Sequence, residues 1–451
     1  MQKNEIYQTE FIDYTSDGAA IARIDGRVVF VPGGAIGDLC EIRIVKVNKT
    51  TAYGRLERIL RPSPDRIDPE CPHAAQCGGC SYWHISYEAE LAAKKKKVET
   101  AVHRLGGCEL SSEGIVGSDS VYSYRNKAQY PVGNSANGII TGFYRARSHS
   151  IIPTDRCLIQ AACSDQLACC VREWMERYSV PAYDEGAHRG AIRHVYTRIG
   201  ENTGEVLLCL VTATRHLPHM DELVSMARRT CPQLVGIILN LNTKPGNAIL
   251  GKQYQAIWGR DYLEDTLCGN RFRISPATFY QVNHNQAERL YQCAIEYADL
   301  TPDSTVLDLY CGVGTITLAL ARNAKHVIGA EIVPQSIENA RKNAVLNNLE
   351  HVEFICADAG TAAQKLAQRG LQPDVIVVDP PRKGIDQLTV DSIAAMSPQK
   401  VVYVSCDPAT MARDIKLLRN VGYQLVRYRV FDLFPRTFHV ETVALMSRIE
   451  E

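Results

Sequence analysis

Hydrophobic and polar positions divide the chain into stretches with different periodicities. Residues 1–61 carry short alternating runs at 20–24, 28–31 and 41–47, separated by glycine-containing turns. Alternation with a period of two predicts strands, and about five short strands in this length are typical of a small closed β-barrel of the OB type. We therefore expect an OB-like β-barrel over residues 1–61, a fold that commonly binds oligonucleotides.

The middle of the chain, residues 62–270, mixes both periodicities after a proline-containing linker. The stretch 83–105 predicts a helix with a run of four lysines, which is either a solvated face or a phosphate contact. Alternating runs at 192–199, 205–212 and 234–241 predict strands, with a helix between the last two. This pattern is typical of an α+β domain.

From residue 271 to residue 451, apolar β-branched runs alternate with helical patterns, which predicts a Rossmann-like α/β domain with a parallel, doubly wound sheet. The expected strands are short and bounded by glycine, proline or acidic residues. They lie at 305–310, 326–330, up to 356, 374–378 and 401–404.

Composition narrows the class of protein. Lys plus Arg and Asp plus Glu are both 50, so the net charge is zero and any basic surface must be local. The polar N-terminus lacks the apolar core of a signal peptide, and no apolar run is long enough to span a membrane. We therefore expect a cytoplasmic, monomeric protein. Its 16 cysteines are then reduced thiols, some of them ligands or nucleophiles.

The motif VSCDP places Cys406 directly after the predicted strand 401–404. Parallel sheets carry their chemistry at the carboxyl ends of strands, and the N-terminus of a following helix would favour the thiolate. A buried, inert cysteine is the alternative. Glu441 begins a strand over 442–446 that should pair beside the Cys406 strand. A partly desolvated carboxylate near a thiol can act as a base, although a salt bridge would also explain it.

A cofactor site is predicted at the same edge of the sheet. Cys311-Gly312-Val313-Gly314 follows a strand and precedes a helix, which suits close approach of a ligand to the backbone. Glu331 ends the next strand about 20 residues after Tyr310, the spacing of a ribose-binding carboxylate. Asp358 ends the third strand and suits an adenine amino group. Asp379 opens a DPPR motif that is foreign to dinucleotide enzymes, so S-adenosylmethionine (SAM) is the better ligand.

The sequence CPHAAQCGGC gathers Cys71, Cys77 and Cys80 in a spacing that indicates a metal or cluster site. Zinc would need a fourth ligand nearby, for which His73 and His84 are the local candidates. An iron–sulfur cluster would recruit a distant cysteine. We expect Cys157 in that role, with Cys163 as its rival.

Aromatic and basic residues alternate at 123–132 and again at 142–147. This combination suits single-stranded RNA, because aromatic rings stack on bases while cations meet phosphates.

Several motifs together resemble the RNA uracil-5-methyltransferase family: SPATFYQVN at 275–283, DLYCGVGT, DPPRKG, VSCDP and FPRTFHVE. The N-terminal stretch resembles a TRAM domain, and the four cysteines resemble the [4Fe-4S] site of this family. The likeness covers nearly the whole chain and is nearest to the branch that acts on 23S ribosomal RNA.

The resemblance implies that Gln281, Tyr310, Glu331 and Asp379 contact SAM, with Asp358 at a position that is looser in the family. It also implies that Cys406 is the nucleophile toward a flipped-out uridine and that Glu441 is the base. The same chemistry on tRNA is an alternative. A non-catalytic RNA-binding protein would not need this cysteine and glutamate, and an amine methyltransferase, whose D/N-P-P-Y/F motif resembles DPP, would not need Cys406.

Overall fold

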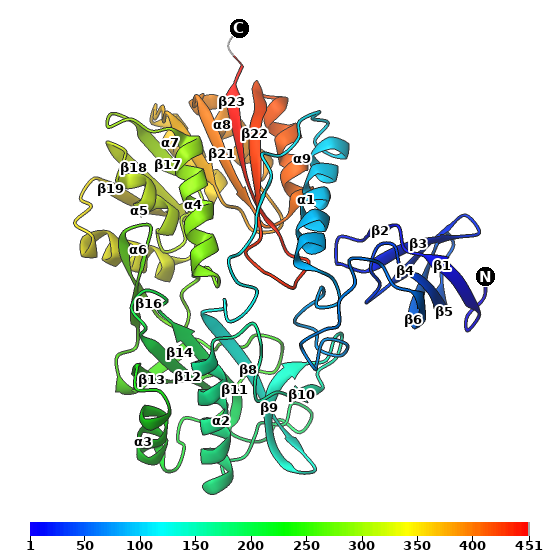
Figure 1. The fold of residues 1–451 in the computed structure, drawn as a ribbon. Coiled ribbons are helices and arrows are strands. Elements are labelled where there is room, and N and C mark those ends of the chain that lie inside the picture. Colours follow the sequence, from blue (N-terminus) through cyan, green and yellow to red (C-terminus); the bar gives the residue numbers. More distant parts are fainter. Residues whose placement is uncertain (450–451) are drawn as a thin grey trace.

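The computed structural model describes residues 1–449, which contain sheets of six, seven, two and eight strands (Figure 1). The last two residues of the expected range 271–451 lie outside the described part. No helix within residues 1–449 is long and apolar enough to cross a membrane.

The N-terminal sheet has its own core, because alternate residues of its strands turn inward. In β5, Cys40, Ile42 and Ile44 are buried while their neighbours are partly exposed. The strand order is β1-β5-β6-β4-β3-β2. The bounds are β1 (Ile6–Glu10), β2 (Asp13–Tyr14), β3 (Ala20–Ile24), β4 (Arg27–Val31), β5 (Leu39–Val47) and β6 (Thr51–Arg61).

Helix α1 (Tyr87–Arg104) begins where the Ser86 hydroxyl accepts a hydrogen bond from the Ala89 amide at 3.2 Å. Its Val98 and Val102 pack into the core of the C-terminal sheet. The lysine run is not a uniform solvated face, because Lys94 is only 1 % exposed. Strand β7 (Ile115–Val116) also joins the C-terminal sheet. The expected central range, 62–270, therefore contributes two elements to the C-terminal unit.

The central sheet has the order β10-β9-β8-β11-β12-β13-β14. Helices α2 (Ala162–Arg177) and α3 (Met220–Thr230) cover one face, and the hairpin β15 (Leu263–Leu267)–β16 (Asn270–Ile274) packs on the other. The remaining bounds are β8 (Lys127–Ser135), β9 (Gly138–Tyr144), β10 (Ile151–Pro153), β11 (Ile192–Ile199), β12 (Val206–Thr212), β13 (Leu234–Leu241) and β14 (Gln253–Gly259). The three strands and the helix predicted from periodicity match β11, β12, β13 and α3.

The C-terminal sheet has the order β19-β18-β17-β20-β21-β23-β22-β7. Its first five strands are parallel, as predicted, whereas β23 runs antiparallel to both of its neighbours. The bounds are β17 (Thr305–Asp308), β18 (His326–Glu331), β19 (Val352–Cys356), β20 (Val375–Val378), β21 (Lys400–Ser405), β22 (Tyr423–Phe431) and β23 (Glu441–Arg448).

Helices cover both faces of this sheet (Figure 1). One face packs against α4 (His284–Ala298), α5 (Thr315–Ala321) and α6 (Pro334–Leu346). The other packs against α1, α7 (Ala359–Gln368), α8 (Gln387–Met396) and α9 (Pro408–Arg419). Strand β22 runs in the same direction as β21, so it ends at the carboxyl edge of the parallel strands. The segment after β22 therefore lies at that edge.

A buried carboxylate fixes the N-terminal unit to the chain that follows it. Asp38 is fully buried and accepts hydrogen bonds from the amides of Ala35 at 2.7 Å and Ser63 at 2.9 Å. The Arg66 guanidinium also donates to it, through Nε at 2.9 Å. Burial alone would raise the pKa of Asp38, but Arg66 and the two amides more than offset burial and lower it.

We predict that Asp38→Asn destabilises the N-terminal unit by about 3 kcal/mol at neutral pH, because Arg66 loses its partner in a buried site. Hydrogen exchange of the β3 amides measures this, with the exposed Asp25→Asn as control. Since the folded pKa of Asp38 is lowered, its contribution is complete above its ordinary pKa of 3.8 and lost as the pH falls through the folded value. The gap between wild type and variant should thus shrink only below about pH 4. Equal exchange at pH 7 would contradict the role of Asp38.

Candidate active site

The two residues predicted to carry the chemistry lie on neighbouring strands. Cys406 follows β21, and Ser405, the last residue of β21, pairs with Thr442 of β23. Glu441 precedes Thr442, so it lies beside the turn that holds Cys406. The predicted pairing of these two strands is confirmed, although in antiparallel form. Glu441 is 4 % exposed and Cys406 is partly buried.

The turn after β21 is held by local hydrogen bonds. The Asp407 carboxylate caps α9 by accepting from the Thr410 amide at 2.9 Å, and the Ser405 hydroxyl accepts from the Asp407 amide at 3.1 Å. Pro408 occupies the first turn of α9, where its missing N–H costs nothing. These contacts leave the Cys406 side chain at the carboxyl edge of the sheet.

Electrostatics at this edge disfavour negative charge. Burial raises the pKa of Cys406 to about 11, helped by Glu441 and Asp379 and opposed by Arg382. Burial and Asp379 likewise raise the pKa of Glu441 well above its ordinary value. The prediction that the N-terminus of α9 would favour the Cys406 thiolate is therefore wrong, because desolvation and two carboxyl groups outweigh it.

Residues predicted to bind the cofactor lie along the same edge. Tyr310 follows β17, Glu331 ends β18, Asp358 follows β19 and Asp379 follows β20. Their strands are adjacent in the order β19-β18-β17-β20. The turn between β17 and α5 uses Gly312 and Gly314, both with positive φ, so a larger residue at either position would be strained.

The predicted SAM-binding residues differ in how many of their polar atoms are already used in hydrogen bonds within the protein. Burial raises the pKa of Asp379 to about 7. The Glu331 carboxylate accepts from the Val333 amide at 2.8 Å through one oxygen. Asp358 is exposed and caps α7 by accepting from the Thr361 amide at 3.0 Å. Gln281 is buried, with its backbone carbonyl held by the Asn126 side chain at 2.9 Å. Asp358 is therefore the most committed to a local structural role.

Three basic or ring residues near the site were not singled out from the sequence. Arg382 Nη2 lies 3.4 Å from His439 Nδ1, and both belong to motifs already noted. Burial, then Arg382 and Lys97, lower the pKa of His439 to about 4. Lys97 Nζ donates to the Phe438 carbonyl at 3.1 Å, and burial lowers its pKa to about 8. The lysine run was the only sequence signal for Lys97.

The four predicted cysteine ligands, Cys71, Cys77, Cys80 and Cys157, line one cavity of about 350 Å³. Cys163, the alternative to Cys157 as fourth ligand, lies on α2 and does not line this cavity. Its thiol contacts Cys231 instead. Within residues 1–449, no three Cys, His, Asp or Glu side chains are close enough to hold a single metal ion. His84 is also committed elsewhere, with Nε2 3.0 Å from the Gly34 carbonyl.

The same cavity receives basic side chains from the predicted RNA-binding stretch. Arg125, just before β8, and Lys127 of β8 line it, together with the polar Gln129 two residues further along the strand. Tyr124 and Tyr130 are buried instead, with their hydroxyls on Pro435 and Asp165. The prediction that these two rings stack on bases is therefore wrong. The cavity is also lined by Phe434, Thr437 and His439, which belong to the segment before Glu441.

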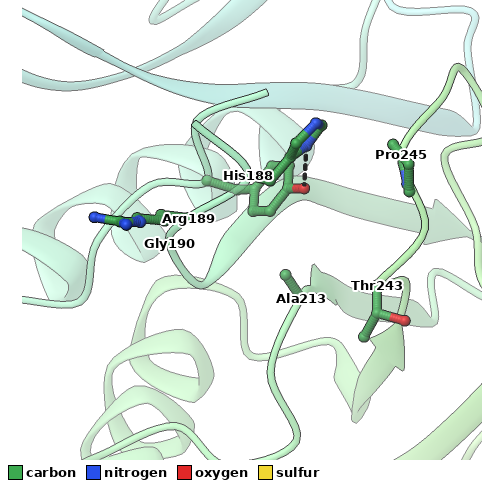
Figure 2. Close-up of a pocket in the computed structure, with 7 residues that line it drawn as sticks. His188, Arg189, Gly190, Ala213, Thr243 and Pro245 are labelled. Carbon is green, nitrogen blue, oxygen red and sulfur yellow. Dashed lines mark hydrogen bonds between the residues drawn. The ribbon is translucent and has the colours of Figure 1, made fainter. Parts of the chain in front are cut away.

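A second cavity, of about 410 Å³, lies in the central unit (Figure 2). Figure 2 shows His188 and Gly190 on one side of it and Thr243 and Pro245 on the other. The cavity is at the end of the sheet where Ile192 pairs with Thr212. The other end of β11 reaches the C-terminal unit through Asn126. None of the predicted site residues lines this cavity.

Comparison with family models matches residues 247–449 to tRNA (uracil-5-)-methyltransferase and residues 7–56 to the TRAM domain. An uncharacterized RNA methyltransferase of Clostridium tetani is 41% identical over 99% of this chain and 97% of its own length. A second such protein, from Halalkalibacterium halodurans, is 42% identical over 99% of this chain and 98% of its own length.

Among solved structures, the fold is similar to that of Pyrococcus abyssi tRNA (uracil-54, C5)-methyltransferase in complex with S-adenosyl-L-homocysteine. The TM-score is 0.78, with 26% identity over 98% of this chain and 100% of that chain. Together with the full-length relatives, these matches identify the family. The chain is a member of the SAM-dependent RNA uracil-5-methyltransferase family and carries a TRAM domain at its N-terminal end.

Proposed function

We propose that this protein transfers a methyl group from SAM to carbon 5 of a uridine in RNA through a covalent intermediate on Cys406. The observation that carries the proposal is the placement of Cys406 and Glu441 beside each other at the carboxyl edge, across β21 and β23. A thiol next to a carboxyl group has no use in direct methylation of an amine. It suits a reaction that needs a nucleophile first and a base later.

Carbon 5 of uracil is a poor nucleophile until the ring is activated. The Cys406 sulfur adds to carbon 6, which pushes the ring electrons onto the carbon 4 oxygen as an enolate. When bound, SAM would supply an electrophilic methyl group to carbon 5, and its sulfur–methyl bond would break to leave S-adenosylhomocysteine. Glu441 removes the remaining proton from carbon 5, and the electrons of that bond expel the Cys406 thiolate and restore the ring.

The raised pKa values fit a site that is completed by its ligands. A partly buried Cys406 with a pKa of about 11 is protonated at neutral pH, so its proton must leave before or during addition. The positive sulfonium of SAM would favour the charged forms of Asp379 and Glu441. Arg382 already acts on Cys406 and Glu441 in that direction.

The proposed SAM contacts follow from where each side chain lies at the carboxyl edge and from whether it already has a hydrogen-bond partner. Asp379 and Gln281 would lie near the methionine end, close to the reaction centre, while Glu331 would bind the ribose hydroxyls and Tyr310 would pack on the cofactor. Ile332 is 64% exposed directly after Glu331, which suits packing on the adenine ring. Asp358 is the weakest of these proposals, because its carboxylate already caps α7.

We predict that Cys406→Ala abolishes methylation while SAM affinity is unchanged, because no enolate forms without addition at carbon 6. Glu441→Gln should still add and transfer the methyl group, but lose about 10²–10⁴-fold in release, the usual worth of a general base. A methylated RNA–protein adduct should accumulate, visible as a slow band on a denaturing gel.

For the same reaction, RNA containing 5-fluorouridine should trap the wild-type enzyme, because fluorine cannot leave as a cation. Retained activity in Cys406→Ala would overturn the covalent route. Normal turnover of Glu441→Gln without an adduct would assign the base to another group.

The RNA substrate is proposed to be 23S ribosomal RNA, with the target uridine flipped out of its stack to reach both Cys406 and SAM. The support is the combination of the TRAM domain, the four-cysteine cavity and the motif set described above. Transfer RNA is the second candidate, because a protein of similar structure over the full length is a tRNA (uracil-54, C5)-methyltransferase.

We predict that deleting the gene removes 5-methyluridine from 23S ribosomal RNA and leaves tRNA unchanged, as mapped by mass spectrometry of both RNA pools. A plasmid carrying the wild-type gene should restore the lost modification, and one carrying Cys406→Ala should not. Loss confined to tRNA would favour the second candidate, and no loss in either pool would refute both.

The four-cysteine cavity fits a [4Fe-4S] cluster better than a zinc ion. Four thiols from two distant segments line one space, yet no three ligand side chains within residues 1–449 converge on a single ion. A cluster of eight atoms is larger than one ion, so its ligands stand farther apart. Cys71, Cys77, Cys80 and Cys157 would hold it, and it would cross-link the segment 71–80 to residue 157.

We predict that protein purified without oxygen is brown and carries about four irons per chain. Cys157→Ala should lose the iron, whereas Cys163→Ala, a control on α2 outside the cavity, should keep it. Iron analysis and the visible absorption spectrum measure both. A colourless protein with one zinc, or loss of iron in the Cys163 variant alone, would refute the assignment.

A further inference from the structure

The nine residues between β22 and β23, Asp432 to Val440, lead directly into Glu441. A buried lysine of α1 holds the first part of this segment. Lys94 Nζ donates to Asp432 Oδ1 at 2.6 Å, to the Phe434 carbonyl at 3.1 Å and to Glu90 Oε1 at 2.7 Å. Lys94 is 1 % exposed, and both carboxylates are fully buried. None of these groups can exchange its partner for water without opening the structure.

Arg436, in the middle of the segment, is held even more closely. Its backbone is left-handed, with φ of 67°, a conformation that a non-glycine residue keeps only when neighbours impose it. The Arg436 amide donates to Glu90 Oε1 at 2.8 Å. Its guanidinium donates to the Ile85 carbonyl at 3.0 Å and lies 4.9 Å from the centre of the Trp83 ring.

The segment that contains Cys71, Cys77 and Cys80 also holds Arg436, through the backbone. The Arg436 carbonyl accepts hydrogen bonds from the amides of Ser81 at 2.7 Å and Tyr82 at 3.1 Å, the two residues that follow Cys80. The Tyr124 hydroxyl donates to the Pro435 carbonyl at 3.0 Å. The path of this segment therefore depends on where the residues just after a predicted cluster ligand are placed.

The far end of the segment forms a wall beside the reaction centre. His439 lies 3.4 Å from the Arg382 guanidinium, and Lys97 holds the Phe438 carbonyl at 3.1 Å. The Glu441 carboxylate itself accepts no hydrogen bond from any residue of the described range 1–449. Packing alone therefore sets its direction, and the neighbouring segment supplies part of that packing.

We propose that Lys94 is a positioning residue for Glu441, and that Lys94, Asp432, Arg436 and residues 80–82 form one clamp that couples the cysteine site to proton removal from carbon 5. The inference rests on the proposed function. Addition by Cys406 depends on the turn after β21, which the clamp does not touch. Loss of the clamp should thus slow the second half of the cycle more than the first.

The test compares Lys94→Met with Lys95→Met, a neighbour on α1 whose side chain is 41% exposed and forms only a 3.8 Å ion pair with Glu99. Single-turnover reactions use RNA with tritium on carbon 5 of uridine and SAM with a labelled methyl group. Methyl incorporation reports addition and transfer, and tritium released to water reports proton removal. In Lys94→Met, tritium release should fall at least about tenfold relative to methyl incorporation, a fraction of what a general base contributes. In Lys95→Met the two should stay equal.

Two further measurements separate positioning from general loss of structure. Amide exchange over residues 434–439 should rise in Lys94→Met while that of β17 and β18 is unchanged. Cys157→Ala should show the same split between methyl incorporation and tritium release, and Cys163→Ala should not, which keeps the proposal testable if Lys94→Met does not fold.

Equal slowing of both steps, or no change in either, would overturn the clamp. These outcomes are distinct from failure of the proposed function, in which the wild-type protein itself would form no adduct with 5-fluorouridine RNA.

Discussion

Antiparallel insertion of β23 between β21 and β22 is the constraint on which the site depends. A parallel sheet brings the carboxyl ends of β17, β18, β20 and β21 to one edge, but it cannot bring a strand start there. The antiparallel strand does so, because it begins where its neighbour β21 ends. Its first residue, Glu441, thereby reaches the turn that carries Cys406. One register shift along β23 would turn Glu441 to the opposite face of the sheet.

This placement has an electrostatic cost. Cys406, Glu441 and Asp379 share a desolvated edge, and each pKa is raised by burial and by its acidic neighbours. The basic group nearby, Arg382, offsets only part of that effect on Cys406 and Glu441. A site in this state binds a cation well, and the sulfonium of SAM is one. In the proposed mechanism, SAM binding and activation of Cys406 are therefore expected to be coupled through charge rather than through direct contact.

The contacts around Arg436 extend this dependence to distant parts of the chain. Residues 81–82, Lys94 and Tyr124 come from three separate segments, yet all of them hold residues 432–436. The central unit and α1 are therefore part of the reaction centre's framework, although neither carries a catalytic group. This arrangement would give the proposed cluster a structural role, since the proposed reaction moves no electron.

Much of this molecule follows from local sequence. The five parallel strands of the C-terminal sheet, the turn at Gly312 and Gly314, and the position of Cys406 after β21 were predictable because periodicity and glycine placement act over a few residues. The pairing of the Glu441 strand with the Cys406 strand was also predictable, but its direction was not. Tertiary packing decided what local patterns cannot express: that Lys94 is buried rather than solvated, that Tyr124 and Tyr130 face inward, and that Cys406 has a raised pKa. Each of these depends on residues outside the local pattern, which for Lys94 and Tyr124 lie hundreds of positions away, at Asp432 and Pro435. Burial and charge are set by neighbours in space and not along the chain.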